Sequence, residues 1–485
     1  MIKPVQWKNR INFLTDEQVS QIHNATLQVL EKTGVKMPLP EDKLEKLQDL
    51  GLIYNRDMQR MHFPPGIVEA ALKSVPSEYT LYARKPENDM PIDGKHGYLT
   101  TDGSATRFFD LETHELRDST SKDLADLCIV ADYVPQISFY WPSVAAREFT
   151  PAIQPLYELK TVLANTTKHV QAMTAVDPVN AQGTVDICRA VAGGAKAFKE
   201  KPFVSTFICS ISPLEYERKG MEAAFIYAEA GVPTGFMPMQ AGCSTAPATL
   251  AGVLVQGNAE ILAGIIAMEL LYPGAPTFYG SCATFMELHH GNVVCSSPND
   301  YMLQAFCAQL ARYYNMPSNI GTCSPGAKST DWDCGMENSV SVAMSFLGNA
   351  DMMCGAGLTN SGAIFSVEQM LLDCECYDMM LNTLGGMEVN EETLALDVIH
   401  AVNYGSGDKH YLNQKHTLRH LREIWQPIVS HRGNYNDWQK KGAKSSFMLA
   451  NELARDILKK HDPEVKIDLA GIEQILSDYE KQAAL

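Results

Sequence analysis

Short apolar runs alternate with amphipathic segments along most of the chain. From residue 98 onward, each run of apolar, Thr or Ser residues ends in a turn that contains Gly, Pro or Ser, and a segment of about 15 to 25 residues with helical periodicity follows. Eight such pairs occur one after another. A strand followed by a helix, repeated eight times, predicts an α/β fold, a (β/α)8 TIM barrel.

The predicted strands and helices alternate regularly. The strands are expected at residues 98–103, 139–145, 169–176, 203–209, 233–239, 276–283, 318–324 and 351–357. The helices are expected at about 120–134, 151–166, 180–199, 213–230, 247–272, 298–314, 331–348 and 366–384. A doubly wound open sheet is the structural alternative, but it more often begins with a Gly-x-Gly-x-x-Gly turn. No such turn follows residues 98–103.

Both ends of the chain have helical patterns. Thr15 has the position of a cap before a helix that Gly34 ends, a second helix is expected at 41–50, and a third follows Pro65. We therefore expect a helical N-terminal region (1–97), a catalytic barrel (98–387) and a helical C-terminal extension (388–485) that packs on the barrel or on another subunit. Residues 107–116 are typical of a hairpin inserted in the first unit.

Composition limits the kind of protein this is. The chain has 485 residues, 45% of them hydrophobic, and a formal net charge of −17. An acidic chain without clustered Lys and Arg is not expected to bind nucleic acid. There is no signal-peptide pattern, and polar residues interrupt the longest apolar tract (248–272), which predicts a core helix and no membrane span. Twelve cysteines without a Cys-x-x-Cys pair indicate reduced thiols in the cytoplasm.

The reacting groups of a TIM barrel lie where its strands meet the following loops. That rule nominates Thr101, Asp102, Ser143, Arg147, Asp177, Ser210, Ser212, Gln240, Ser281, Thr284, Thr322, Ser324, Lys328, Cys354, Thr359, Asn360 and Phe365. His, Asp and Glu do not gather at several of these ends, so no metal site is predicted. Lys328 lies in a loop, whereas a Schiff-base lysine is expected inside a strand. We predict no catalytic acid, base or nucleophile.

Aromatic and Met side chains are frequent in the same strands. They include Tyr98, Phe139, Tyr140, Trp141, Phe207, Phe236, Met237, Met239, Phe278, Tyr279, Phe285 and Phe365. Bulky apolar residues fill any barrel interior, so a core role is one interpretation. The functional interpretation is an aromatic cage for a quaternary ammonium group, which cannot donate hydrogen bonds. Because the first and eighth strands are neighbours in a closed barrel, we expect Tyr98 and Phe365 to enclose that group.

Two segments near the seventh and eighth strands resemble a known family. The run Ala327-Lys328-Ser329-Thr330-Asp331-Trp332-Asp333-Cys334-Gly335-Met336-Glu337 resembles the Ala-Lys-x-x-Asp-x-Gln-x-Gly-x-Glu signature of the trimethylamine:corrinoid methyltransferase family. Gly355-Ala356-Gly357-Leu358, with residues 366–373, resembles the next block of that family. The similarity covers the whole chain.

Two departures point to one branch of this family. Asp333 stands where the family often has Gln, and the sequence contains no pyrrolysine, the residue with which the trimethylamine enzymes present their substrate. The chain therefore resembles the non-pyrrolysine branch. Its members demethylate quaternary amines such as glycine betaine, proline betaine or carnitine and pass the methyl group to the Co(I) corrinoid of a partner protein. The resemblance implies a corrinoid supplied by that partner and no cofactor bound by this chain.

Seven residues are our candidates for substrate binding. They are Tyr98, Asp102, Arg147, Lys328, Asp331, Cys354 and Phe365. A betaine also carries a carboxylate, for which Arg147, Lys328 or loop N–H groups are the expected partners. Asp331 has the position of a helix N-cap as well. Glu337 and Glu368 also match the family's motifs, but each is expected to be solvated or to lie between helices.

Loss of a methyl group from a quaternary amine expels a neutral tertiary amine, so the enzyme mainly positions the substrate and transfers no proton. A neutral cage suits this reaction because a tightly held anion stabilises the ground state. Asp408-x-His410 resembles a cobalt-ligating motif, but Asn413 replaces its Gly. The expected partners are a cognate corrinoid protein, a small quaternary amine and further copies of this chain. A lyase or aldolase acting on a small carbonyl compound, and a non-catalytic binder, remain alternatives.

Overall fold

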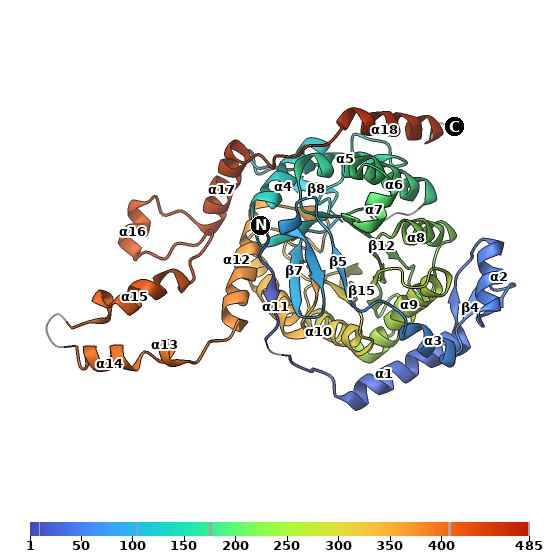
Figure 1. The fold of residues 1–485 in the computed structure, drawn as a ribbon, viewed down its shortest axis with the longest axis horizontal. Coiled ribbons are helices and arrows are strands. Elements are labelled where there is room, and N and C mark those ends of the chain that lie inside the picture. Colours follow the sequence, from blue (N-terminus) through green and yellow to red (C-terminus); the bar gives the residue numbers. More distant parts are fainter. Residues whose placement is uncertain (9, 104, 174–176, 406–408, 484–485) are drawn as a thin grey trace.

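Eight parallel strands close into a barrel in the computed structural model, which describes residues 1–8, 10–103, 105–173, 177–405 and 409–483 (Figure 1). The strands are β7 (His96–Thr100), β10 (Ile137–Tyr140), β11 (His169–Gln171), β12 (Val204–Cys209), β13 (Thr234–Met237), β15 (Thr277–Ser281), β18 (Ser318–Gly321) and β19 (Met352–Cys354). Each strand pairs with the next, and β19 returns to β7 with Met353 opposite Leu99. The predicted TIM barrel is confirmed. Residues 174–176 of the predicted third strand lie outside the described residues.

The outer helices follow their strands as predicted. They are α4 (Ser121–Tyr133), α5 (Gln154–Asn165), α6 (Pro178–Ala192), α8 (Arg218–Ala230), α9 (Leu250–Leu271), α10 (Pro298–Tyr313), α11 (Trp332–Gly348) and α12 (Val367–Leu384). The helix predicted at 180–199 is instead two helices, α6 and α7 (Ala195–Glu200). Gly193 and Gly194, with φ of 79° and 140°, form the break between them.

Short strands extend the loops at the carboxyl ends of the barrel. The predicted hairpin is present as β8 (Arg107–Phe109) and β9 (Leu116–Asp118). The sequence did not predict β14 (Ala241–Gly242), β16 (Thr284–Glu287), β17 (Asn292–Val293), β20 (Leu358–Thr359) or β21 (Ile364–Phe365). The last of these pairs in parallel with β8, with Phe365 opposite Phe108. Strands of two to four residues leave too little periodicity to be found in a sequence.

The N-terminal region is less helical than expected. It contains α1 (Asp16–Gln28), capped by Thr15 as predicted, α2 (Glu41–Asp49) and α3 (Pro65–Leu72). It also contains a three-stranded sheet of β2 (Val35–Lys36), β4 (Arg60–His62) and β3 (Ile53–Asn55), and a pair of β5 (Tyr79–Leu81) and β6 (Met90–Ile92). Near the chain start, β1 (Val5–Gln6) pairs antiparallel with the beginning of β7.

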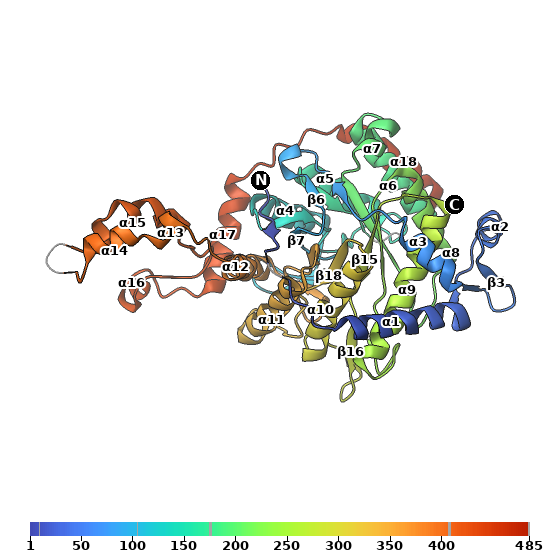
Figure 2. The same cartoon turned by 60° about the horizontal axis from the view of Figure 1, so that its bottom comes forward.

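The N-terminal region covers the apolar helix α9. Among the described residues it is the one helix long and apolar enough to cross a membrane, and most of its side chains are buried. Helix α1 packs across it (Figure 2), and α2 and α3 contact it as well. The buried Asn258 amide of α9 donates to Thr26 of α1 (2.9 Å) and to the Tyr314 hydroxyl (2.7 Å). This tract is a core helix, as predicted.

The C-terminal part leaves the barrel and returns to it. Residues 386–405 and 409–444, which we call the arm, project from the body with the short helices α13 (Glu391–Leu394), α14 (Leu396–Val402), α15 (Lys415–His420) and α16 (Tyr435–Lys440) (Figures 1 and 2). Then α17 (Ser446–Lys460) packs on α12 and α4, and α18 (Leu469–Ala483) packs on α6 and α5. In the described part of the arm, only Val402 and Val429 are buried.

A fully buried lysine joins two elements at the amino end of the barrel. Lys168, just before β11, donates from Nζ to the carbonyl oxygens of Ala131 (2.8 Å), Val134 (2.8 Å) and Ile137 (2.6 Å). These carbonyls belong to the end of α4 and the start of β10. Burial lowers the pKa of Lys168 to about 8, so the ammonium group is still charged at neutral pH.

We expect Lys168→Met to lower the free energy of unfolding by about 2–4 kcal/mol, because three buried carbonyls lose their donor. Lys160→Met is the control, since Lys160 pairs with the exposed Glu473 and lies over the Tyr157 ring at 6.0 Å, and its effect should stay below ~1 kcal/mol. Urea unfolding followed by circular dichroism measures both. Equal stability of the two variants would show that the bonds of Lys168 contribute little.

Candidate functional site

A cavity of about 480 Å³ lies at the carboxyl ends of the barrel strands. Its wall takes residues from the ends of seven of the eight strands, from the β16–β17 segment and from the first turns of α10. The lining residues are Asp102, Gly103, Trp141, Met173, Met237, Met239, Cys282, Ala283, Thr284, Val293, Cys295, Asp300, Gln304, Gly321, Thr322, Ser324, Cys354, Leu358, Ser361 and Gly362. In a TIM barrel, this is where a small-molecule site is expected.

The aromatic part of the wall is Trp141, directly after β10. Its ring stacks on Phe207, with centroids 5.2 Å apart and planes at 26°, and Phe207 meets Phe278 edge to face. A Cβ at Gly103 would lie 2.4 Å from Trp141 Nε1, so only glycine leaves room for this ring. Among the described residues, Nε1 has no hydrogen-bond partner. A fixed indole ring therefore borders the cavity.

Sulfur atoms form a second part of the wall. They belong to Met173, Met237, Met239, Cys282, Cys295 and Cys354. A hydrogen bond with Cys282, together with burial, raises the pKa of Cys354 well above its ordinary value, and burial raises the pKa of Cys295 to about 12. These two thiols are protonated at neutral pH and are poor nucleophiles. The methionine sulfurs and these two thiols give the wall a polarizable, uncharged part.

Among the described residues that line the cavity, the charged ones are two aspartates, Asp102 and Asp300. Asp300 caps α10: its Oδ2 accepts from the N–H of Ser297 (2.6 Å), and its Oδ1 accepts from the N–H of Phe285 (3.2 Å). Burial raises the pKa of Asp300. The second aspartate, Asp102, comes after β7 and lies near Cys354 and Cys295. Among the described lining residues there is no Lys, Arg or His, so the wall favours a cation.

The structure brings two of the seven predicted substrate-binding residues into this wall, Asp102 and Cys354. Tyr98 is buried lower in the barrel, and its hydroxyl donates to the carbonyl oxygen of Pro91 (2.9 Å). The ring of Phe365 packs over Gly357 in the core. The two rings therefore do not meet at the cavity as the sequence predicted, because Tyr98 lies inside β7, two residues before its end, and Phe365 lies on β21, which pairs with β8. The aromatic residue at the cavity is Trp141.

The other three candidates lie outside the cavity wall. Arg147 pairs with Asp118, with Nη1 and Oδ1 3.1 Å apart, and both side chains are exposed. Lys328 donates to the carbonyl oxygen of Gly326 in its own loop. Asp331 is the N-cap of α11, as the alternative interpretation of the sequence held. The expected carboxylate partners Arg147 and Lys328 are thus not part of the cavity.

The acidic residues of the two family-like segments hold the loops in place. Glu337 accepts from the N–H of Ala327 (3.2 Å), which fixes the loop after β18. Glu368 is buried and accepts from the amide of Asn451 on α17 (2.8 Å). These carboxylates lie between elements of the rim and do not line the cavity, in agreement with the structural role that the sequence left open for them.

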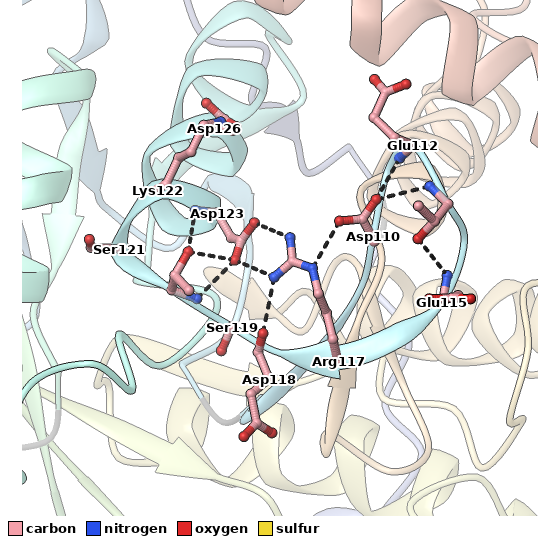
Figure 3. A network of polar contacts seen from close by, with 12 residues as sticks. Asp110, Glu112, Glu115, Arg117, Asp118, Ser119, Ser121, Lys122, Asp123 and Asp126 are labelled. Carbon is pink, nitrogen blue, oxygen red and sulfur yellow. Dashed lines mark hydrogen bonds and ion pairs between the residues drawn. The ribbon is translucent and has the colours of Figure 1, made fainter.

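Arg117 fixes the β8–β9 hairpin to α4, as Figure 3 shows. Its Nε donates to Asp110 (2.8 Å), and its two terminal nitrogens donate to the two oxygens of Asp123 (2.7 and 2.6 Å). Asp123 in turn completes the capping box of α4 with Thr120. The hydrogen bonds that Arg117 donates to Asp123 are the main cause of the raised pKa of Arg117. The guanidinium group of Arg117 therefore has a structural role, holding the hairpin and α4 together.

Several strand-end residues nominated from the sequence also have structural partners. Asp177 caps α6, accepting from the N–H of Asn180 (2.9 Å). Ser210 and Ser212 both donate to Oε2 of Glu260, at 2.5 and 2.8 Å. Of the nominated residues, Thr284, Thr322 and Ser324 do line the cavity.

The sequence did not nominate several lining residues, among them Met173, Cys282, Cys295, Asp300 and Gln304. Met173 and Cys282 lie within the predicted strands 169–176 and 276–283, one or two residues after β11 and β15 end, so the strand-end rule could have found them. Cys295, Asp300 and Gln304 come from the segment after β17 and from α10. No local signal in the sequence indicates that these elements lean over the barrel.

One group of potential metal ligands occurs among the described residues. It consists of Glu392, His416 and His420 on the arm, whose ligand atoms lie within 4.8 Å of one another. Arg419 pairs with the same Glu392 carboxylate (2.5 Å), and His420 also pairs with Glu423 (2.7 Å). These ion pairs account for the cluster, and it is far along the chain from the cavity residues.

A TIM barrel with an aromatic and sulfur-lined cavity and two carboxylates is a small-molecule site of a kind suited to organic cations. The chain belongs to the trimethylamine methyltransferase (MTTB) family, whose sequence model matches residues 2–484. It is therefore a methyltransferase by family. The resemblance found in the two segments at the seventh and eighth strands is confirmed.

The relatives agree over nearly the full length. The trimethylamine methyltransferase MttB of Desulfitobacterium hafniense (strain DSM 10664 / DCB-2) is 32% identical over 450 residues, 93% of this chain and 90% of that protein. The glycine betaine methyltransferase of Desulfitobacterium hafniense (strain Y51) is 31% identical over 435 residues, 89% of each. The crystal structure of the Methanosarcina barkeri monomethylamine methyltransferase MtmB shares the fold, with a TM-score of 0.52, 10% identity and 93% of each chain covered.

The buried carboxyl group of Asp373 on α12 has a pKa close to neutral pH. Asp373 accepts at Oδ2 from the N–H of Gly357 (2.9 Å) and at Oδ1 from Asn338 (2.7 Å) and Gln369 (2.8 Å). Burial raises the pKa of Asp373 to about 7, although the three donors favour the charged form. Asp373 thus holds the loop that follows β19.

This shift predicts a pH dependence of stability. A carboxyl whose folded pKa exceeds its unfolded value of about 4 stabilises the fold fully below pH 4, and this contribution is lost as the pH rises through 7. We expect the free energy of unfolding to fall by roughly 2–4 kcal/mol between pH 4 and 8 because of this group. Asp373→Asn should remove that part of the slope, whatever its stability at one pH. Urea unfolding of both proteins at several pH values measures it, and parallel slopes would contradict it.

Proposed function

We propose that this protein transfers a methyl group from a quaternary ammonium substrate to the Co(I) corrinoid of a separate partner protein. The observation that carries the proposal is the cavity at the strand ends of an MTTB-family barrel, with Trp141, six sulfur atoms, two carboxylates and no described cationic residue. The relatives named above act on trimethylamine and on glycine betaine, which supports an N-methyl substrate.

The residues of this chain hold and orient the substrate in this proposal. The indole face of Trp141 and the Met and Cys side chains surround the methylammonium group, which offers no hydrogen-bond donors. The N–CH₃ bond breaks with both electrons staying on nitrogen, so a neutral tertiary amine leaves and no general acid is required. The protonated thiols Cys295 and Cys354 suit this role, because a thiolate would compete for the methyl group.

The corrinoid belongs to the partner in this proposal, where it supplies the nucleophile that accepts the methyl group. Within the described residues, the chain after β21 forms helices only, whereas a corrinoid-binding domain needs an α/β fold. Asp408 of the cobalt-like motif lies outside the described residues, and His410 is exposed on the arm. We place the reaction in the cytoplasm, where the twelve free cysteines stay reduced.

The substrate range tests this proposal. With reduced corrinoid present, a quaternary amine should be demethylated and trimethylamine should not, because no pyrrolysine presents the latter. The methylated corrinoid is measured by visible absorbance. Turnover of trimethylamine without turnover of any quaternary amine would reverse the assignment, and no methyl transfer from either would favour the lyase or the binder.

Trp141 should contribute directly to catalytic efficiency. A cation over an indole face is worth ~0.5–2 kcal/mol, so Trp141→Ala should lower kcat/KM by about threefold to thirtyfold. Tyr133→Ala is the control, since this ring is 52% exposed at the end of α4, outside the cavity wall, and should leave kcat/KM unchanged. Circular dichroism checks that both variants fold. Unchanged kinetics of Trp141→Ala would remove the ring from the proposed site.

We further propose that the arm contacts a second copy of this chain. A segment with almost no core of its own must bury its apolar side chains elsewhere. Exposed apolar residues of the arm include Met387, Val389, Leu396, Tyr404, Leu412, Leu418 and Tyr435. The expected acceptor is an exposed stripe on α11 at four-residue spacing, Trp332, Met336 and Val340. The corrinoid protein must leave after each transfer, so it cannot cover the arm permanently.

This assembly can be tested by mass. Wild-type protein should sediment at a multiple of 53.5 kDa, and Met336→Asp on the α11 stripe should shift it toward the monomer because a charge is buried in the contact. Ile53→Asp is the control, since Ile53 is exposed on β3, far from the arm in the chain, and should keep the wild-type mass. A monomeric wild-type protein at micromolar concentration would contradict the proposal.

A further inference from the structure

We infer that the preferred substrate is a quaternary ammonium cation whose remaining substituent is uncharged, that is, a choline-like cation and not a betaine. This inference rests on the proposed function and specifies its substrate class. It comes from the charges at the cavity, which leave a place for the ammonium group and none for a carboxylate.

The cavity wall contains no cationic side chain among the residues that the structure describes. The residues outside the described ranges cannot supply a cation either. Asn9, Ser104 and residues 174–176, 406–408 and 484–485 include no Lys, Arg or His. A carboxylate transferred from water into such a wall loses its hydration without gaining a partner. A site that selects a carboxylate normally provides an Arg or a Lys.

Cations near the rim are engaged elsewhere. Arg117 binds Asp110 and Asp123, Arg147 pairs with Asp118, and the Lys328 ammonium group donates within its own loop. Arg117 is held by two carboxylates and cannot turn toward the cavity without breaking both pairs. Arg147 is exposed and screened by water, so it offers little to a buried carboxylate.

A helix N-terminus is the other common partner of a carboxylate. The helix that begins at this cavity is α10, and its first turn already has an anion: Asp300 and Ser297 form its capping box. The side chain of Asp300 also occupies the N–H of Phe285. The positive end of α10 is therefore neutralised by the protein itself.

The remaining wall suits a cation with a neutral polar group. Asp102 and Asp300 make the local potential negative, and the Trp141 ring lines the same cavity. Thr284, Ser324 and Gln304 supply hydroxyl and amide groups that can hydrogen-bond to a substrate hydroxyl. The net charge of −17 favours the approach of a cation over that of a zwitterion.

Three probes of similar size separate charge from shape: choline, glycine betaine and 3,3-dimethyl-1-butanol, in which carbon replaces the nitrogen of choline. Calorimetry on the full-length protein should show choline binding about tenfold or more tightly than either of the other two. With reduced corrinoid, kcat/KM for demethylation of choline should exceed that of glycine betaine by a similar factor. Glycine betaine that binds and reacts as well as choline would overturn the inference and leave the proposed function standing.

Three variants test which residues determine the preference for choline over betaine. Met239→Lys places a cation in the wall, at a side chain 54% exposed and so able to accept a longer one, and should shift the choline-to-betaine ratio toward betaine by about tenfold or more. Lys328→Gln and Arg147→Gln should leave the wild-type ratio unchanged. If either of these two abolished betaine binding, the inference would fail. If choline bound tightly but no methyl group were transferred from any quaternary amine, the proposed function would fail while the charge selectivity stood.

Discussion

The pairing of β19 with β7 is the constraint on which the rest of the molecule depends. These strands are far apart in the chain, and their parallel register sets Cys354 opposite Thr100. Closure removes both sheet edges and turns eight strand ends toward one point. Asp102 and Cys354, which follow the two strands of this seam, line the same cavity only because the barrel closes. Without that pairing there would be no site.

Most charged side chains at the rim of the barrel hold its loops in place. Buried or partly buried carboxylates such as Glu260, Glu337 and Asp373 accept N–H or O–H donors from the loops after β12, β18 and β19. Arg117 is held between two aspartates in the same way. Because these bonds fix the loops, the cavity can be lined by weakly polar groups that need few partners. The result is a preformed site with a negative bias, as a diffuse organic cation requires.

The two ends of the chain complete the barrel in different ways. The N-terminal region covers α9, whose apolar surface would otherwise face water on its outer side. The C-terminal part returns to the barrel through α17 and α18, and Glu375 of α12 anchors the arm by accepting from the N–H groups of Ile428 and Val429. Between these anchors the arm has little core, which is the feature expected of a segment that folds against another molecule.

The sequence by itself determined the barrel, because each strand and helix carries its own periodicity and these local signals repeat eight times. It also determined the family, and it named Asp102, Cys354 and Trp141 near strand ends. Only the tertiary structure decided which side chains share the cavity. Tyr98 and Phe365 follow the same rules as Trp141, yet one points to Pro91 and the other packs over Gly357. Asp300 and Cys295 reach the cavity through loop geometry that no local pattern encodes, since loop direction depends on contacts between distant residues.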